Sequence, residues 1–231
     1  MMTAMIYLDH NATTPVSPQV LEAMLPFFRE SFGNASSFYR VGRAAGASLA
    51  EARAAVAECI GASAQEIVFT GSGTEADNLA LRGVCRARRG GACHIVTSAV
   101  EHHAVLKTCE DLNEQGVEVT LVPVDSNGLV DPDEVGRSIT PRTVLISVMA
   151  ANNETGVIQR TSEIGKIARQ QGIPFHVDAV QALGKVPFNV ENACADLVSL
   201  SAHKIYGPKG IGALYVRKGT PIAPVVTGGS Q

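Results

Sequence analysis

A lysine and an aspartate each close an apolar run of the type that forms a strand. Lys204 ends the run LVSLSAHK at residues 197–204, and Asp178 ends the run IPFHVD at residues 173–178. Ser201 and His203 lie beside the lysine. An amine, a carboxylate, a hydroxyl and an imidazole at neighbouring strand ends suit a cofactor that has an aldehyde, a ring nitrogen and a phosphate. Pyridoxal 5'-phosphate has these three groups.

A phosphate site is predicted in the segment EIVFTGSGTEADN at residues 66–78, which is typical of a strand, a glycine loop and a helix start. Free amides at the helix N-terminus and the Thr74 hydroxyl can bind an anion, and Gly73 lets the backbone approach it. The alternative is a capping box formed by Thr74 and Asp77. The loop does not match the pattern GxxxxGK[ST], so we do not expect a nucleotide phosphate.

Further polar groups follow two other predicted strands. His102 comes after residues 94–98, and Asn153 lies in the run NNETG after residues 143–149. Ligands of open α/β sheets bind beyond the carboxyl ends of the strands, where both residues would lie. The alternative for His102 is a purely structural role, and the alternative for the run that contains Asn153 is an ordinary turn. The histidines have no zinc-ligand spacing, so no metal is expected.

Asp178 needs a cationic partner if it is buried, because an unpaired buried carboxylate costs on the order of several kcal/mol. A surface arginine or a helix cap is the alternative to a protonated pyridine nitrogen. Gln181 follows three residues later and can reach the phenolic oxygen of the same ring. Lysines are most often solvated, as we expect for Lys209, whereas Lys204 stands at a strand end beside a glycine-rich turn.

Short β-branched runs alternate with helical patterns along the chain. The predicted strands are residues 67–70, 94–98, 117–124, 143–149, 175–178, 197–201 and 211–216. This alternation predicts an α/β fold with a mostly parallel seven-stranded sheet and helices on both faces. Five of the strand ends carry the polar groups named above to one edge of that sheet.

Helix boundaries are marked by capping residues. Helices are predicted near residues 18–29 and over 43–60, and Asp131 with Pro132 begins another. On the helix at 43–60, an apolar stripe is expected to face the core through Leu49, Arg53, Val56 and Ile60. Left-handed C-caps are expected at Gly61, Gly116 and Gly172.

The composition is that of a globular protein. The 231 residues are 45% hydrophobic and 18% charged, with a net charge of −3 spread along the chain. We therefore expect a small-molecule substrate and neither nucleic acid nor membrane as a partner. Five cysteines without a C-x-x-C pair, and the lack of a signal peptide or a long apolar run, favour a cytoplasmic protein.

One domain is expected over residues 16–231, after an N-terminal arm at residues 1–15. The arm is too short and too rich in turn residues to be a domain. The last stretch, residues 221–231, is punctuated by proline and glycine and reads as an interrupted connection.

Taken together, these segments resemble the cysteine desulfurases, pyridoxal-phosphate enzymes of the class V aminotransferase family. The resemblance runs through nearly the whole chain. It is carried by YLD at 7–9, NATTP at 11–15, FGN at 32–34, residues 66–78, EH at 101–102, NNETG at 152–156, HVDAVQ at 176–181 and residues 201–212.

The resemblance implies a role for each site residue. Lys204 bonds covalently to the cofactor, Asp178 pairs with its ring nitrogen, and His102 stacks on the ring and moves protons. Asn153 and Gln181 bind around the phenolic oxygen and the substrate. The phosphate is held by Gly73, Thr74, Ser201 and His203.

By the same resemblance, the chain is the large domain of a fold type I enzyme that removes sulfur from L-cysteine. The products are L-alanine and an enzyme persulfide for iron–sulfur cluster assembly, and the complete enzyme is a homodimer that meets a sulfur-acceptor or scaffold protein. A C-terminal small domain with the nucleophilic cysteine and the carboxylate-binding arginine would follow Gln231. The other hypotheses are a non-catalytic cofactor-binding or protein-interaction relic, a selenocysteine lyase and an aminotransferase.

The sequence departs from the family in three respects. None of its five cysteines is at the position of the nucleophile, and their apolar settings predict inert thiols. Ala35 stands where the family usually has proline, and Tyr39 where histidine is common.

Overall fold

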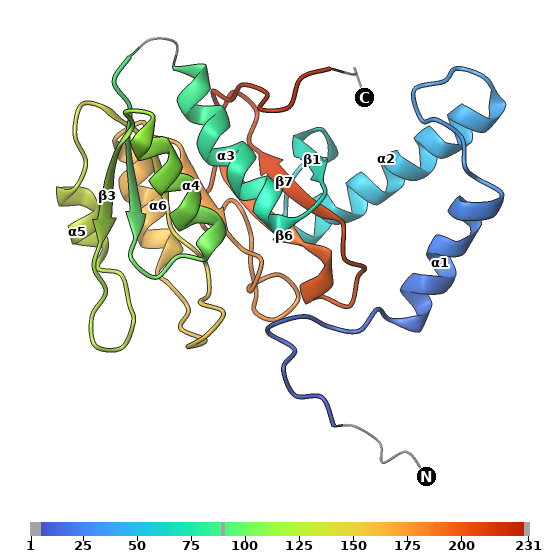
Figure 1. Cartoon of the computed structure of the whole chain (residues 1–231), viewed down its shortest axis with the longest axis horizontal. Coiled ribbons are helices and arrows are strands. Elements are labelled where there is room, and N and C mark those ends of the chain that lie inside the picture. The colour runs from blue at the N-terminus through green and yellow to red at the C-terminus, as the bar shows by residue number, and fades with distance from the viewer. Residues whose placement is uncertain (1–5, 89–90, 229–231) are drawn as a thin grey trace.

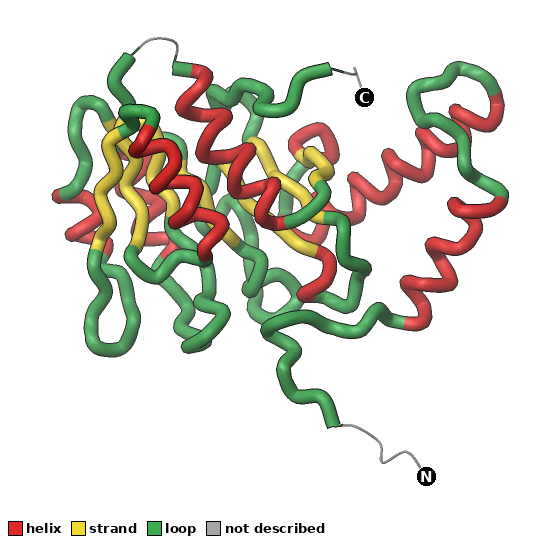
Figure 2. The backbone as a smooth tube through the Cα atoms, viewed as in Figure 1, coloured by secondary structure: helices red, strands yellow, loops and turns green. Residues whose placement is uncertain are grey.

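A computed structural model of the protein describes residues 6–88 and 91–228 (Figure 1). Residues 1–5 of the predicted arm and residues 229–231 of the predicted connection lie outside that description. Strands and helices alternate along the chain and form three layers, with the sheet in the middle (Figure 2). The prediction of an α/β fold is confirmed.

The sheet has seven strands in the order β1-β7-β6-β5-β4-β2-β3. Their bounds are β1 Ile67–Thr70, β2 His94–Ser98, β3 Glu118–Val122, β4 Thr143–Ser147, β5 Phe175–Asp178, β6 Leu197–Ser201 and β7 Gly212–Val216. Only β7 runs antiparallel to its neighbours, β1 and β6. The predicted strands 117–124, 143–149 and 211–216 are each longer than the observed ones.

The helices begin and end close to the predicted residues. Their bounds are α1 Pro18–Arg29, α2 Arg40–Ile60, α3 Gly73–Ala87, α4 His103–Glu114, α5 Pro132–Arg137 and α6 Thr161–Gln170, with short 3-10 turns at Ala64–Glu66 and Ala202–Lys204. Asp131 caps α5 by accepting a hydrogen bond from the amide of Asp133. The expected left-handed glycines are observed at Gly61, Gly116 and Gly172.

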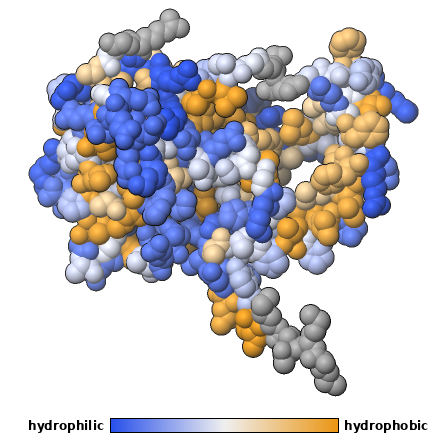
Figure 3. Space-filling model, in the orientation of Figure 1, coloured by the Kyte–Doolittle hydropathy of each residue, from blue (hydrophilic) through white to orange (hydrophobic). Residues whose placement is uncertain are grey.

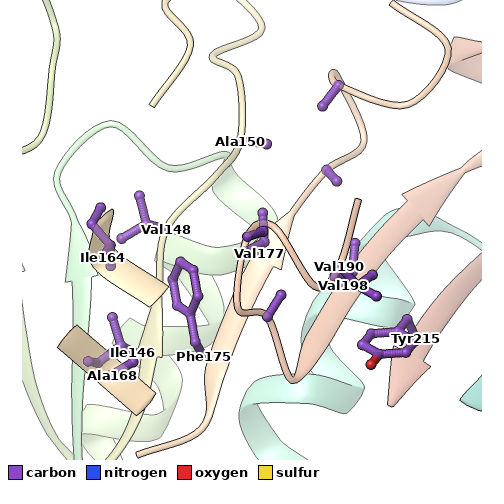
Figure 4. Close-up of a cluster of buried hydrophobic side chains, with 14 of the residues drawn as sticks. Ile146, Val148, Ala150, Ile164, Ala168, Phe175, Val177, Val190, Val198 and Tyr215 are labelled. Atoms are coloured by element: carbon purple, nitrogen blue, oxygen red, sulfur yellow. The ribbon is translucent and has the colours of Figure 1, made fainter. Parts of the chain in front are cut away.

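Both faces of the sheet are covered. Helices α3 and α4 lie in front of it in Figure 1, and α5 and α6 lie behind it. On the α6 side, Phe175 and Val177 of β5 share one buried cluster with Ile164 and Ala168 of α6, and Figure 4 shows the Phe175 ring on the side of these two residues. On the α3 side, a second cluster joins Leu81 to the sheet. Central strands that are apolar on both faces are typical of parallel sheets, since helices cover both sides.

Helices α1 and α2 differ from the other helices because most of their length does not cover the sheet. No residue of α1 is buried, and α1 stands at the right of the molecule in Figure 1. Apolar side chains lie exposed along this part of the surface in Figure 3. The predicted core stripe of α2 is therefore wrong at Leu49, which is 38% exposed, and right at the buried Ile60. A helical stripe identifies an apolar face and does not identify what covers it.

No helix in the described residues is long and apolar enough to cross a lipid bilayer.

Close packing of α6 against the loop before β6 gives a stability prediction at Gly165. A Cβ there would overlap the carbonyl oxygen of Ala193, so we expect Gly165→Ala to lower the free energy of unfolding by about 2 to 4 kcal/mol. Gly136 is a matched control in α5, where a Cβ meets only an ordinary contact 3.7 Å away. Gly136→Ala should be neutral or stabilise by up to ~1 kcal/mol. Urea unfolding measures both, and equal effects would refute the packing argument.

Candidate functional site

One pocket of about 270 Å³ lies at the carboxyl edge of the sheet. Its lining comes from the segments that follow β1, β2, β4, β5 and β6, as the convergence of strand ends predicts. All nine residues predicted for the site line it: Gly73, Thr74, His102, Asn153, Asp178, Gln181, Ser201, His203 and Lys204. The lining also includes Asp77, Met149 and Ala12, which the sequence did not suggest as site residues.

The N-terminus of α3 forms one end of this pocket. Ser72 is the N-cap, and its hydroxyl accepts a hydrogen bond from the amide of Glu75 at 3.0 Å. The alternative of a capping box between Thr74 and Asp77 is therefore wrong. The amides of Gly73 and Thr74 occupy the first two helical positions, which have no partner within a helix. They are available to an anion in the pocket.

The approach of α3 to β6 depends on a glycine. A Cβ at Gly73 would lie 2.8 Å from the side chain of Val180 and 3.3 Å from that of Ser201. Ser201 is buried, and its hydroxyl oxygen has no hydrogen-bond partner among the described residues. Buried hydroxyls are normally paired, so this one is the kind of group that a ligand satisfies.

Asp178 is a carboxyl group buried in the floor of the pocket, with 5% of its surface exposed. Its Oδ1 atom accepts a hydrogen bond from the amide of Val180 at 3.0 Å. Burial raises the pKa of Asp178, while the Val180 amide and the charges of His102 and Lys204 act to lower it. The described residues provide no salt bridge for this carboxyl group.

A buried histidine lies two residues before Asp178 on the same strand. The Nδ1 atom of His176 is 2.8 Å from the hydroxyl of Ser147, and its Nε2 atom is 2.9 Å from the hydroxyl of Ser199. Burial lowers the pKa of His176 to about 3, so the ring is neutral at physiological pH. It links β4, β5 and β6 beneath the pocket without adding a charge.

Lys204 is held by backbone carbonyl groups. Its Nζ atom donates to the oxygen of Asn11 at 2.5 Å and to that of Ala12 at 2.9 Å. Partial burial lowers the pKa of Lys204, while Asp178 and Asp9 act to raise it. A lysine with a lowered pKa is more often an uncharged nucleophilic amine than a solvated lysine is.

The arm before α1 is fastened across the site (Figure 1). Thr14 donates its amide to the carbonyl of His203 at 2.8 Å, and its hydroxyl accepts from the amide of Tyr206 at 2.7 Å. The hydroxyl of Thr13 lies 3.1 Å from Nδ1 of His203. The arm is thus part of the site, which the sequence did not predict because its main contribution to Lys204 comes from the backbone.

Gln181, His102 and Asn153 complete the pocket. The Nε2 atom of Gln181 donates to the carbonyl of Asn11 at 2.9 Å, and its Oε1 atom accepts from Lys185. His102 is the N-cap of α4, and its Nδ1 atom accepts from the amide of Ala104 at 3.1 Å. Because Nδ1 accepts this bond, Nε2 is the ring nitrogen that carries a hydrogen.

The cysteines lie away from the pocket. Burial raises the pKa of both Cys85 and Cys109 to about 12, so these thiols are unreactive, as predicted. Cys93 and Cys194 are buried as well. Cys59 is exposed on α2, so the prediction of an apolar setting is wrong for that residue. The described part of the chain holds no cluster of three or more residues suited to binding a metal.

The strand order and the polar edge define an α/β domain with a polar pocket beyond its strand ends. The family model "Aminotransferase class-V" matches residues 6–231. The chain therefore belongs to the class V aminotransferase family.

The relatives and the similar structures agree with this assignment. Proteins named cysteine desulfurase IscS from Dictyoglomus turgidum and Methanosarcina thermophila are 51% and 52% identical over 98% of this chain, which covers 57% and 56% of their lengths. A solved NifS-like protein is 43% identical, with a TM-score of 0.95 over 98% of this chain and 62% of its own. A structure titled SspA in complex with cysteine is 40% identical, with a TM-score of 0.96 over 98% of this chain and 66% of its own. The chain spans less than two thirds of each.

The lowered pKa of Lys204 predicts its reactivity toward aldehydes. The unprotonated amine reacts, so reductive methylation of Lys204 should rise with pH and reach half of its maximum below the usual lysine pKa of about 10.5. Mass spectrometry of proteolytic fragments after treatment with formaldehyde and cyanoborohydride measures this profile. Lys209, exposed in the next turn, is the control. A Lys204 profile at or above the usual lysine range would contradict the prediction.

Proposed function

We propose that this chain is the cofactor-binding large domain of a pyridoxal-phosphate-dependent cysteine desulfurase. The domain extends over residues 16–231, with residues 1–15 as an arm. The observation that carries the proposal is a single pocket in which a lysine amine and a buried carboxyl group without a salt bridge lie beside a helix N-terminus. Relatives that are named cysteine desulfurase also support the proposal.

The residues of the pocket fit the chemistry of pyridoxal phosphate at three points. The unpaired hydroxyl of Ser201 and the amides of Gly73 and Thr74 suit the phosphate. The carboxyl group of Asp178 suits a protonated ring nitrogen, which would supply the cation that the described residues lack. The amine of Lys204 suits the aldehyde.

Bound pyridoxal phosphate supplies a ring that accepts electrons when the substrate loses a proton. Asp178 would hold the ring nitrogen protonated, because a carboxylate close to that nitrogen favours its positively charged form. His102 would stack on the ring and, through Nε2, transfer protons above the pocket. Gln181 and Asn153 would orient the phenolic oxygen and the substrate, and His203 would add a contact to the phosphate.

We further propose L-cysteine as the substrate, in line with the structure of a similar protein that is titled as a complex with cysteine. A homodimer and a sulfur-acceptor or scaffold protein are the proposed partners of the complete enzyme, and the proposed location is the cytoplasm. Exposed apolar side chains on and after α1, among them Phe28 and Phe32, provide a surface that a protein partner can bury. None of the five cysteines lines the described pocket, and burial raises the pKa of Cys85 and Cys109, so we assign the nucleophile to none of them.

Reconstitution with pyridoxal phosphate tests the cofactor assignment. The wild-type chain should turn yellow, and Lys204→Ala should lose the absorbance band of the covalently bound cofactor, because no other amine lines the described pocket. L-cysteine should change the spectrum of the loaded wild-type protein at lower concentration than L-alanine does. Sulfide release in the presence of a reductant should be slight.

Lys209→Ala is the matched control, because this lysine lies outside the pocket and should leave the band unchanged. A wild-type chain that stays colourless at millimolar cofactor would refute the cofactor assignment. A spectrum that responds equally to L-cysteine and L-alanine would refute the assigned substrate and leave cofactor binding intact.

Alanine substitutions at two serines of β6 distinguish an effect on phosphate binding from an effect on stability. Ser201→Ala removes a hydroxyl that has no partner, so the free energy of unfolding of the cofactor-free chain should change by less than about 0.5 kcal/mol. Affinity for pyridoxal phosphate should fall about tenfold, which corresponds to the loss of one charge-assisted hydrogen bond.

Ser199→Ala is the control on the same strand. It removes the hydroxyl that bonds the Nε2 atom of the buried His176 and leaves only the carboxyl group of Asp77 near that atom, at 3.5 Å, so it should cost about 1 to 3 kcal/mol of stability. Urea unfolding and cofactor titration by absorbance give both quantities. Loss of stability in Ser201→Ala, with affinity unchanged, would contradict the phosphate role.

A further inference from the structure

Glu101 is a buried acid next to the pocket that has no role in the proposed chemistry. It lies between Ser98, the last residue of β2, and His102, the N-cap of α4. It is 4% exposed and does not line the pocket. A buried carboxyl group is costly, so its contacts need an explanation.

The carboxyl group of Glu101 accepts a backbone hydrogen bond just beyond the last paired residues of β2 and β4. The last paired residues of β2 and β4 are Thr97 and Ser147. Beyond them, the amides of Val148 and Ala150 donate to carbonyl groups of β5. The amide between these two, that of Met149, donates instead to Oε1 of Glu101 at 3.0 Å. On the β2 side, the side chain of Glu101 thus takes the place of a backbone acceptor for the Met149 amide.

Two more bonds support this contact, one within the segment of Glu101 and one between the two segments. Oε1 of Glu101 also accepts from the hydroxyl of Ser98 at 2.5 Å, which fixes the carboxyl group to the end of its own strand. The Nδ2 atom of Asn152 donates to the carbonyl of Val100 at 3.0 Å. Residues 98–101 and 149–152 are therefore joined side by side, and each segment is followed by a pocket residue, His102 and Asn153.

We propose that Glu101 is a positioning residue that sets the placement of His102 relative to Asn153 in the cofactor pocket. The inference rests on the proposed function for what the pocket binds, and extends it to a residue that touches neither cofactor nor substrate. Without the bond to Met149, the turn that carries His102 would be attached to the end of β4 through Asn152 alone.

Glu101 performs this role as a neutral acid at pH 7. Burial raises its pKa, the carboxyl group of Asp178 adds to the shift, and the hydrogen bonds from Ser98 and Met149 oppose it, which gives a net pKa of about 8. Its Oε2 atom is buried without a partner among the described residues. The other titratable groups that act on it electrostatically are Asp77 of α3 and the thiol of Cys109 of α4. A glutamine offers the same carbonyl acceptor, so it should replace this glutamate.

Two substitutions test the proposal in the whole chain. Glu101→Gln keeps the acceptor and should bind pyridoxal phosphate within about twofold of the wild type, with the same circular dichroism of the bound cofactor. Glu101→Leu removes the acceptor, and should weaken binding about tenfold and change that circular dichroism. Glu101→Leu with wild-type affinity and dichroism would overturn the inference, and so would equal damage by both substitutions.

Ser98→Ala is the milder variant if Glu101→Leu does not fold. It leaves the Met149 bond in place but frees the carboxyl group from β2, and an altered dichroism with retained folding supports the inference, whereas an unaltered one overturns it. A wild-type chain that binds no pyridoxal phosphate would refute the proposed function. If the wild type binds pyridoxal phosphate, and Glu101→Leu and Ser98→Ala bind it with the same affinity and dichroism, this inference alone is refuted.

Stability measurements on the cofactor-free chain test independently whether Glu101 is protonated at pH 7. The pKa of Glu101 is raised in the folded state, so the unfolded state loses its proton first as pH rises, and the folded state is disfavoured between about pH 4.5 and 8. Relative to Glu101→Gln, the folding constant of the wild type should fall by up to about tenfold per pH unit over this range. A difference that does not depend on pH would overturn the neutral assignment.

Discussion

The carboxyl group of Asp178 is the constraint on which the site depends. It is buried at the end of β5, receives a hydrogen bond from the amide of Val180, and has no salt bridge within the described chain. A parallel sheet that is covered on both faces leaves such a group only the edge beyond the strand ends. Beneath it, His176 adds no charge, because its ring is neutral between two serines. A cation that enters the pocket therefore meets two buried carboxyl groups in the lining, Asp178 and Asp77.

The fold could be predicted because its signals are local. Apolar runs of four to eight residues mark the strands, and Asp131 and Gly61 mark helix ends with side chains or backbone angles that few other residues provide. The site positions could be predicted for a related reason. In a parallel sheet the polar residue that follows each strand must lie at the same edge, so Asp178 and Lys204 meet without any knowledge of side-chain contacts.

Other features could not be predicted because they depend on contacts between distant backbone atoms. The carbonyl groups of Asn11 and Ala12 bind Lys204, and any residue type would provide them. The Met149 amide that engages Glu101 has no signature either. The predictions of a buried stripe on α2 and of an apolar setting for Cys59 are wrong for a different reason. A pattern along one helix does not reveal whether another element covers that helix.

The arm gives the chain an unusual pattern of tolerance to change. Because Ala12 contributes an oxygen that every amino acid possesses, its bond to the amine at position 204 requires no particular side chain at position 12. Losing or gaining a single residue between Ala12 and the anchor at Thr14 would instead shift that oxygen out of reach. For this bond, selection must preserve the spacing to Thr14 and the hydroxyl that holds it, rather than the identity of residue 12.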